Sequence, residues 1–132
     1  MASLDTNCLL RWFLGDVPEH QERVDALLDD LDNVVVDDVI LIEAIFVMES
    51  TMSLSRSTIR SYIDTAMSYD LVINRSLWTS VLATWASHPK LSVVDVYLTA
   101  KAADAGTGPV YTFDLKMINQ LNAVVVPELA DE

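Results

Sequence analysis

Residues 2–7 read Ala2-Ser3-Leu4-Asp5-Thr6-Asn7, a short apolar run that stops at an acid. The helical pattern of residues 8–14 follows at once. The same order, an apolar run, an acid and a helix, returns where residues 110–113 meet Asp114. Short strands that alternate with helices predict a parallel sheet, and small α/β domains place their sites at the carboxyl ends of the strands. Asp5 and Asp114 are therefore the first candidate site residues.

The rest of the chain continues this alternation of strands and helices. Further apolar or β-branched runs predict strands at residues 34–36, 71–73 and 124–126, the middle one being the weakest. Helical patterns occupy residues 19–31, 39–50, 55–69, 76–86 and 93–105. The helix predicted at residues 19–31 is expected to pack one apolar face against the core, and this face consists of Val24, Leu27, Leu28 and Leu31. The last is expected to end at Gly106. The 132 residues thus predict a single domain, 1–132, with a short parallel sheet of four to five strands flanked by helices.

The charge of the chain argues against a nucleic-acid partner. Eight Lys and Arg residues stand against twenty Asp and Glu residues, a formal net charge of −12. Proteins that bind nucleic acid usually carry a basic patch, because neutralising phosphates supplies much of their affinity. A nuclease of this composition needs bound divalent cations and a few local basic residues. The positive mean hydropathy also predicts exposed apolar surface, which suits a dimer or a partner contact.

Targeting signals and cysteine usage indicate where the protein is located and which disulfide and zinc sites it can form. The N-terminus lacks the basic and long apolar segments of a signal peptide. The most apolar run, residues 39–48, is too short to span a bilayer and contains Glu43. We therefore expect a cytoplasmic protein with no membrane contact. Cys8 is the only cysteine, which excludes an internal disulfide and a cysteine-based zinc site. We expect Cys8 to be a small buried packing residue.

Glu43 is the acid that is hardest to explain as ordinary structure. It lies in the sequence VILIEAIFVM, residues 39–48, which predicts a central helix buried nearly all round. A buried carboxylate requires a cation, a metal or a proton, and no Lys or Arg lies within a turn of it. A Glu at the edge of the core that reaches solvent is the alternative. Glu49 points to a different face and is expected to be solvated.

Three further acids have an ordinary explanation as parts of helix caps. Asp5 and Asp114 each stand directly before a predicted helix. Asp95 follows Ser92 at the spacing of the Ser-x-x-Asp capping pattern. If these three and Glu43 shared one cleft, they would repel one another unless a cation neutralised them.

Such a cluster favours a particular metal and a particular chemistry. The two histidines, His20 and His88, fall in polar segments and are expected at the surface rather than among the ligands. Oxygen ligands alone select hard ions, Mg²⁺ or Mn²⁺. A metal held by carboxylates suits phosphodiester hydrolysis, because it activates a water and stabilises charge on the phosphate.

Together with their neighbours, these acids resemble the ordered acidic motifs of PIN domains. The resemblance spans residues 4–126 and rests on Leu4-Asp5-Thr6-Asn7 with Leu9-Leu10, on Glu43 inside an apolar helix, on Asp95 before Leu98-Thr99-Ala100, and on Thr112-Phe113-Asp114. In length and layout the chain is most similar to VapC-type toxins, the ribonuclease halves of type II toxin–antitoxin pairs. The resemblance implies a three-layer α/β/α fold, an endoribonuclease activity that depends on Mg²⁺ or Mn²⁺, dimerisation, and inhibition by a cognate antitoxin.

The resemblance also implies roles for single residues. The catalytic and metal-binding acids would be Asp5, Glu43, Asp95 and Asp114. Thr112 and Asn7 would support them through hydrogen bonds. Ser92 departs from the pattern, since many members carry another acid there, and this leaves the number of metal ions open.

The expected partners are an RNA substrate, a second copy of the chain and an antitoxin whose basic tail matches the acidic surface. Arg11 and Lys116 are the basic residues whose positions suit a phosphate contact, with an ordinary solvated charge as the alternative for each. Trp12, Trp78 and Trp85 could stack on bases. Aromatic residues at helical spacing belong more often to a core or an interface.

Other classes of small α/β protein need residues that are missing. A receiver domain needs an acidic pair after its first strand and a Lys after its last. A nucleotide-binding domain needs a glycine-rich loop, whereas Gly106-Thr107-Gly108 has no third glycine. A phosphatase with a nucleophilic Asp needs an acid two residues later, where Asn7 stands. The remaining alternative is a catalytically weak or inactive PIN-fold module that acts by binding other proteins.

Overall fold

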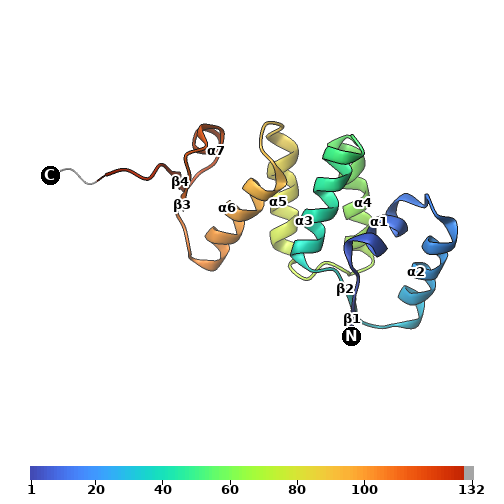
Figure 1. Ribbon diagram of the computed structural model, residues 1–132. Coiled ribbons are helices and arrows are strands. Elements are labelled where there is room, and N and C mark those ends of the chain that lie inside the picture. The colour runs from blue at the N-terminus through green and yellow to red at the C-terminus, as the bar shows by residue number, and fades with distance from the viewer. Residues whose placement is uncertain (130–132) are drawn as a thin grey trace. The chain divides into compact units, whose positions relative to one another are not determined.

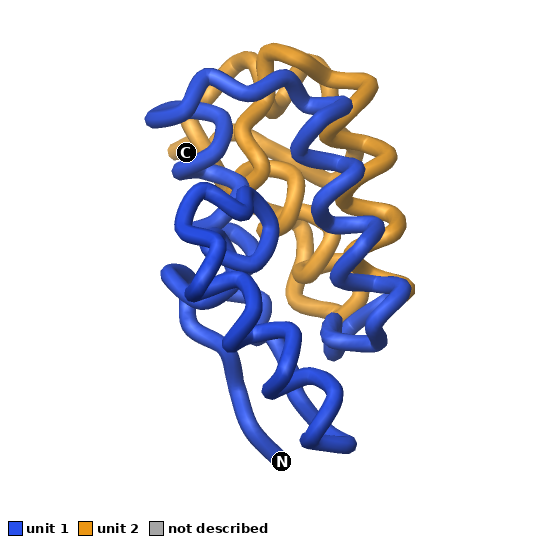
Figure 2. The backbone as a smooth tube through the Cα atoms, turned by 90° about the vertical axis from the view of Figure 1, so that its right-hand side faces the viewer, with its two compact units in different colours: residues 1–75 blue, residues 76–132 orange. Residues whose placement is uncertain are grey.

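The computed structural model describes residues 1–129 and divides into two compact units, Met1–Arg75 and Ser76–Glu132 (Figure 2). Each unit carries one pair of parallel strands and several helices. The single domain expected over residues 1–132 stays a prediction.

The strands of the first unit are short and parallel. β1 (Ala2–Ser3) pairs with β2 (Val34–Val35), with Ala2 opposite Val34. The pairing continues beyond β2 as an isolated parallel bridge between Val36 and Val72. The strand predicted at residues 71–73 is therefore reduced to this one bridge. Val36 is fully buried, as a β-branched residue at the centre of a pairing should be.

The helices of the first unit follow the predicted pattern closely (Figure 1). They are α1 (Thr6–Leu14), α2 (Pro18–Asp30), α3 (Asp38–Phe46) and α4 (Arg56–Ser68). α1 packs against α2 and α3. It ends at Gly15, whose φ of 61° lies in the left-handed region that glycine enters without strain. A Cβ at Gly15 would lie 2.9 Å from Nε2 of Gln21, so glycine also leaves room for that side chain.

Polar contacts hold α2 to α1. Nε1 of Trp12 donates to Oδ1 of Asp25 at 2.7 Å, and Nε2 of Gln21 donates to the Trp12 carbonyl at 2.8 Å. The expected apolar face of α2 is only partly correct, because Val24 is buried whereas Leu27 and Leu31 are exposed. The helical period groups these residues correctly, but it does not say how much of the group a neighbour covers.

The helix expected to be buried nearly all round, residues 39–50, differs from the prediction in two ways. α3 leaves one face open, since Val39 is 61% and Phe46 57% exposed. It then widens into a π-helical turn, η1 (Val47–Thr51). Apolar composition alone predicts burial on every side, because a run that is apolar nearly throughout has no period from which a solvent face can be read.

The second unit begins with helix α5 and ends with a parallel strand pair. Its elements are α5 (Arg75–Ser87), α6 (Val93–Ala105), β3 (Val110–Tyr111), α7 (Leu115–Gln120) and β4 (Val124–Val125). β3 and β4 are parallel, with Val110 opposite Val124. α6 occupies the predicted residues and ends at Gly106, which has a φ of 71°.

All three tryptophans belong to the core. Trp12 meets Tyr69 edge-on at 5.1 Å, and Trp78 stacks on Tyr97 at 5.3 Å. Trp85 is fully buried. The structural interpretation of these residues is confirmed, and rings in these positions are not available for stacking on bases.

Residues 1–129 therefore form an α/β fold that is mostly helical, with short parallel strands in two pairs. The predicted sheet of four to five strands is represented by these pairs and the bridge to Val72. The three-layer order stays a prediction. Over the same residues, each helix is too short or too polar to cross a bilayer.

Candidate metal-binding carboxylates

Asp5 caps the first helix of the chain. Its Oδ1 accepts the backbone N–H of Cys8 at 2.8 Å, which is the usual bond from an N-cap side chain to the third helical residue. The side chain is exposed, as is that of Asn7 in the same turn. An ionised carboxylate has about four lone-pair sites, so the cap leaves acceptor capacity for a cation.

Cys8 lies beside this cap and is exposed, so its expected burial is wrong. The apolar character of Cys8 predicts packing in the core. Neighbouring residues of a helix point in different directions, however, and on α1 Leu9 is buried whereas Cys8 is exposed. Partial desolvation, followed by the hydrogen bond and the negative charge of Asp5, raises the pKa of the Cys8 thiol above its ordinary value. The thiol is thus accessible to solvent, and its raised pKa reduces the fraction of thiolate at any given pH.

Glu43 is exposed on α3, so the argument that it needs a cation because it is buried is wrong. It shares the open face of the helix with Val39 and Phe46, at spacings of four and three residues. Within the described first unit, no hydrogen bond or ion pair reaches its carboxylate. Glu43 is therefore an unpaired acid in an apolar surrounding, and its role as a metal ligand stays a prediction.

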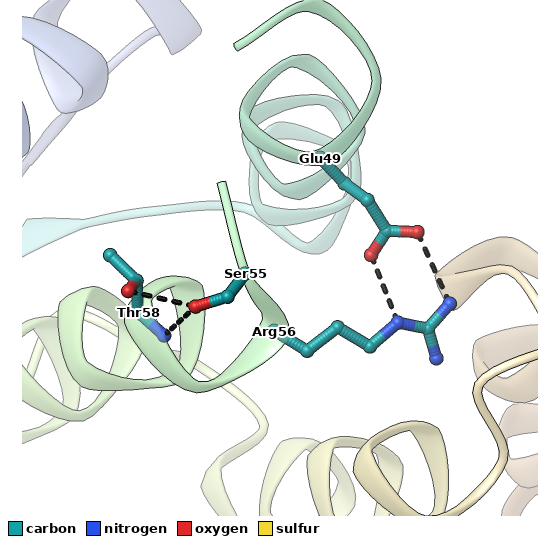
Figure 3. Close-up of polar contacts among 4 residues, drawn as sticks. All are labelled: Glu49, Ser55, Arg56 and Thr58. Atoms are coloured by element: carbon teal, nitrogen blue, oxygen red, sulfur yellow. Dashed lines mark hydrogen bonds and ion pairs between the residues drawn. The ribbon is translucent and has the colours of Figure 1, made fainter. Parts of the chain in front are cut away.

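Glu49, expected to be solvated, instead forms a bidentate and partly buried ion pair (Figure 3). Its two carboxylate oxygens accept from Nε and Nη2 of Arg56, each at 3.1 Å. The side chains of Glu49 and Arg56 are 34% and 19% exposed. This bidentate pair ties the π-helical turn to the first residue of α4, where Ser55 caps the helix by accepting the Thr58 N–H. The two charges are seven residues apart on different elements, so no periodic signal in the sequence could reveal them.

Asp95 occupies the first turn of α6. Oγ of Ser92 accepts the Asp95 N–H at 3.2 Å, which confirms the capping pattern. The hydroxyl of Thr99 donates to the Asp95 carbonyl at 2.9 Å. The carboxylate itself is half-buried, and within the described second unit it has no hydrogen-bond or ion-pair partner. Two hydrogen bonds thus hold the backbone of Asp95, whereas its carboxylate has no partner within the described second unit.

Asp114 is the N-cap of α7. Its Oδ1 accepts the Lys116 N–H at 2.9 Å. Oγ1 of Thr112 accepts the backbone N–H of Asp114 at 3.0 Å, so Thr112 supports the turn rather than the carboxylate. Around this half-buried acid lie exposed apolar side chains, Phe113 at 76% and Leu115 at 65%.

The four acids are divided between the two units. Asp5 and Glu43 belong to the first, and Asp95 and Asp114 to the second. Within each unit, over residues 1–129, no three His, Cys, Asp or Glu side chains stand close enough to hold a metal ion. The four-acid cluster therefore stays a prediction. The donors themselves are suitable, because two carboxylates lack protein partners and the two caps keep spare lone pairs.

The basic residues predicted to meet a phosphate differ in their surroundings. Arg11 is ion-paired with Asp16 through Nη1. Lys116 is exposed beside Asp114. His20 is also exposed, whereas His88 is half-buried, with Nδ1 at 2.7 Å from the Thr84 carbonyl oxygen.

Comparison with known proteins adds one finding to this geometry. The family model of the PIN domain matches residues 2–122, a range that includes all four candidate acids. No curated protein and no solved structure matches the chain.

Proposed function

The chain belongs to the PIN domain family, and from this premise we propose that it is an endoribonuclease that hydrolyses RNA with Mg²⁺ or Mn²⁺. The fold of this family is nuclease-like, and its members are commonly metal-dependent ribonucleases. The observation that carries the proposal is the presence of four carboxylates within the matched residues, three of them in the first turn or at the cap of a helix.

The donor chemistry of these residues fits a hard divalent cation. Asp5, Glu43, Asp95 and Asp114 offer oxygen atoms only, which is the ligand set of Mg²⁺ and Mn²⁺. A metal bound there would supply an activated water and would stabilise negative charge on the phosphate.

The chain itself contributes the orientation of these carboxylates. The cap bonds of Asp5 and Asp114 fix the side chains against their helices. The helix N-terminus beneath each carries partial positive charge, which attracts a negatively charged side chain. Thr112 holds the backbone of Asp114 in place. We expect side chains held in this way to lose little conformational freedom when a metal binds.

The test of this function is metal-dependent cleavage. Purified protein stripped with EDTA should not cut a single-stranded RNA, and adding Mn²⁺ or Mg²⁺ should restore cutting in the interior of the strand. Calcium alone, which takes the same oxygen ligands with looser geometry, serves as the comparison ion. Cleavage that persists undiminished in excess EDTA would contradict the proposal.

A second candidate function is a catalytically weak or inactive module of the same fold that binds other proteins. The apolar residues Tyr111, Phe113 and Leu115 favour it, because all three are exposed and exposed apolar side chains suit a contact with another protein. The same metal titration separates the two functions, since a binding module shows no Mn²⁺-dependent cleavage.

The biological role that we propose is that of a toxin restrained by an antitoxin. The formal net charge of −12 favours a partner that brings cations, such as a tail rich in Arg or Lys. The apolar surface suits both a homodimer and such a partner. A neighbouring reading frame should encode a small protein with a basic tail, which should inhibit cleavage when the two are co-purified. The lack of such a frame would count against the toxin role.

A further inference from the structure

We propose that the pocket lined by α5, α6 and the end of α7 binds a base of the single-stranded RNA, beside Asp95. The inference rests on the proposed function, because it concerns a further contact with the same substrate. The whole pocket belongs to the second unit. Its polar lining residues are Ser80, Thr84 and His88 on α5, Thr99 on α6, and Gln120 and Asn122 at and just after the end of α7.

The lining of this pocket carries no formal charge, although the chain as a whole is strongly acidic. None of the ten described residues that line it is Asp, Glu, Lys or Arg. A phosphate or a metal ion taken into a pocket needs charged groups to balance it. Of the parts of an RNA strand, only the bases and riboses are uncharged, so the lining suits these parts rather than the phosphates.

The polar side chains of the pocket keep hydrogen-bonding capacity for a ligand. Within the described part of the second unit, the side chains of Ser80, Gln120 and Asn122 bond to no other residue. A hydroxyl or a carboxamide both donates and accepts. The edge of a base also presents donors and acceptors together, and proteins that recognise single-stranded RNA commonly bind these edges. The free groups of the pocket therefore match the edge of a base.

The size and the apolar part of the pocket suit the rest of a nucleoside. The pocket has a volume of about 460 Å³, within the range of about 300–1,000 Å³ typical of small-molecule sites. Its remaining lining residues are apolar, namely Val96, Ala100, Ala103 and Leu121. Apolar side chains suit the flat faces of a base. The space is thus large enough for a base together with its ribose.

The segment that carries Asn122 is held by the backbone on both sides. The Leu121 N–H donates to the Met117 carbonyl at 2.9 Å, and the Ala123 carbonyl accepts the Val110 N–H at 2.9 Å. Ala123 has a φ of 56°, a left-handed conformation that residues other than glycine adopt only when their surroundings impose it. The Asn122 amide is therefore presented from a fixed backbone, which reduces the ordering that binding requires.

The position of the pocket on α6 links it to the candidate site. The hydroxyl of Thr99, which lines the pocket, donates to the Asp95 carbonyl at 2.9 Å. Residues four apart lie on the same face of a helix, so the pocket begins one turn from Asp95. A strand whose base occupies the pocket would have a phosphate of its backbone near this carboxylate.

The test measures how much the bases contribute to binding. The full chain is titrated in Ca²⁺ with a single-stranded RNA decamer that contains all four bases, and with an abasic decamer that has the same number of phosphates. The ratio of the two affinities, from fluorescence anisotropy, removes the contribution of phosphate and metal contacts. RNA should bind about tenfold more tightly or better, as expected for a bound base. Equal affinities, or no binding of either decamer, would overturn the proposal.

An amide variant places this contribution in the pocket. Asn122→Ala should lower the ratio about fivefold, as expected for one lost hydrogen bond. The matched control is Asn119→Ala, which removes the same amide from an exposed residue of α7 that does not line the pocket. Equal ratios for the two variants would overturn the proposal.

A second variant fills the space instead of removing a bond. Ala103 is exposed and lines the pocket, whereas Ala105 is exposed two residues later on α6 and does not. Ala103→Leu should lower the ratio about tenfold, and Ala105→Leu should leave it unchanged. A change of oligomer mass in Ala103→Leu without a change of the ratio would assign the pocket to a second copy of the chain and overturn the assignment to RNA.

The remaining outcomes separate the pocket from the catalysis. A lowered ratio in Asn122→Ala, in a protein without Mn²⁺-dependent cleavage, supports the pocket and contradicts the proposed nuclease. Mn²⁺-dependent cleavage together with a ratio that neither pocket variant changes overturns the pocket and leaves the nuclease standing.

Discussion

At the scale of single residues, the carboxylate of Asp5 has two separable tasks. It caps α1 through the Cys8 N–H, and it is a candidate metal ligand. Asparagine caps a helix about as well as aspartate, but it carries no charge with which to hold a cation. Conservative and truncating changes at this position therefore report on different properties of the protein.

The first prediction concerns the capping task alone. Asp5→Ala should lower the free energy of unfolding by about 1 kcal/mol, because the cap bond is lost, and Asp5→Asn should change it by only a few tenths. Urea denaturation followed by circular dichroism measures both. Equal destabilisation by the two changes would show that charge, rather than the cap, stabilises this helix.

A second prediction concerns Cys8, whose thiol pKa is raised by partial burial and by the neighbouring Asp5. A raised pKa means less thiolate at any given pH, so alkylation at pH 8 should be slower than for a free cysteine. The rate should also reach half its maximum at a higher pH. Asp5→Asn should move this midpoint downward, since it removes the carboxylate charge. A midpoint that is already at the value of a free thiol would contradict this assignment.

At the scale of elements, the Glu49–Arg56 pair connects the π-helical turn with α4. A partly buried bidentate pair contributes more than an exposed one. Glu49→Gln should lower the free energy of unfolding by about 1 kcal/mol. Glu19→Gln, which breaks an exposed pair with Arg23, should change it by a few tenths at most. Thermal or urea denaturation of both variants provides the comparison, and equal effects would exclude a special role for the Glu49 pair.

The elements also show which parts of the fold can be predicted from sequence. α6 lies on its predicted residues because Ser92 and Gly106 mark its ends by local chemistry. The open face of α3 could not be predicted, since Val39 and Phe46 resemble core residues in composition. The contact of Glu49 with Arg56 depends on how two elements meet, and no spacing in the chain encodes that meeting.

In the candidate site, too, some features can be predicted from the local sequence and others cannot. The positions of Asp5, Asp95 and Asp114 at helix starts follow from strand ends and caps that are visible in the sequence. The exposure of Glu43 does not, because the apolar composition of residues 39–48 predicts a helix that is buried on nearly every side.

At the scale of the whole molecule, the central claim is that an acidic PIN domain cleaves RNA through metal-bound carboxylates. Because the net charge is −12, we propose that RNA binds only after a metal has been loaded. Replacing an acid that holds a metal should therefore abolish RNA cleavage, whereas replacing an acid that only adds charge should not.

Manganese-dependent RNA cleavage by Asp95→Asn, compared with Asp104→Asn, tests this claim most directly. Both changes neutralise one acid of α6, but Asp104 is exposed near the far end of the helix and is not a candidate ligand. We predict that Asp95→Asn folds normally and loses cleavage by at least about a hundredfold, as expected when a metal ligand is removed. Asp104→Asn should retain full activity. Equal cleavage by the two variants would contradict the account.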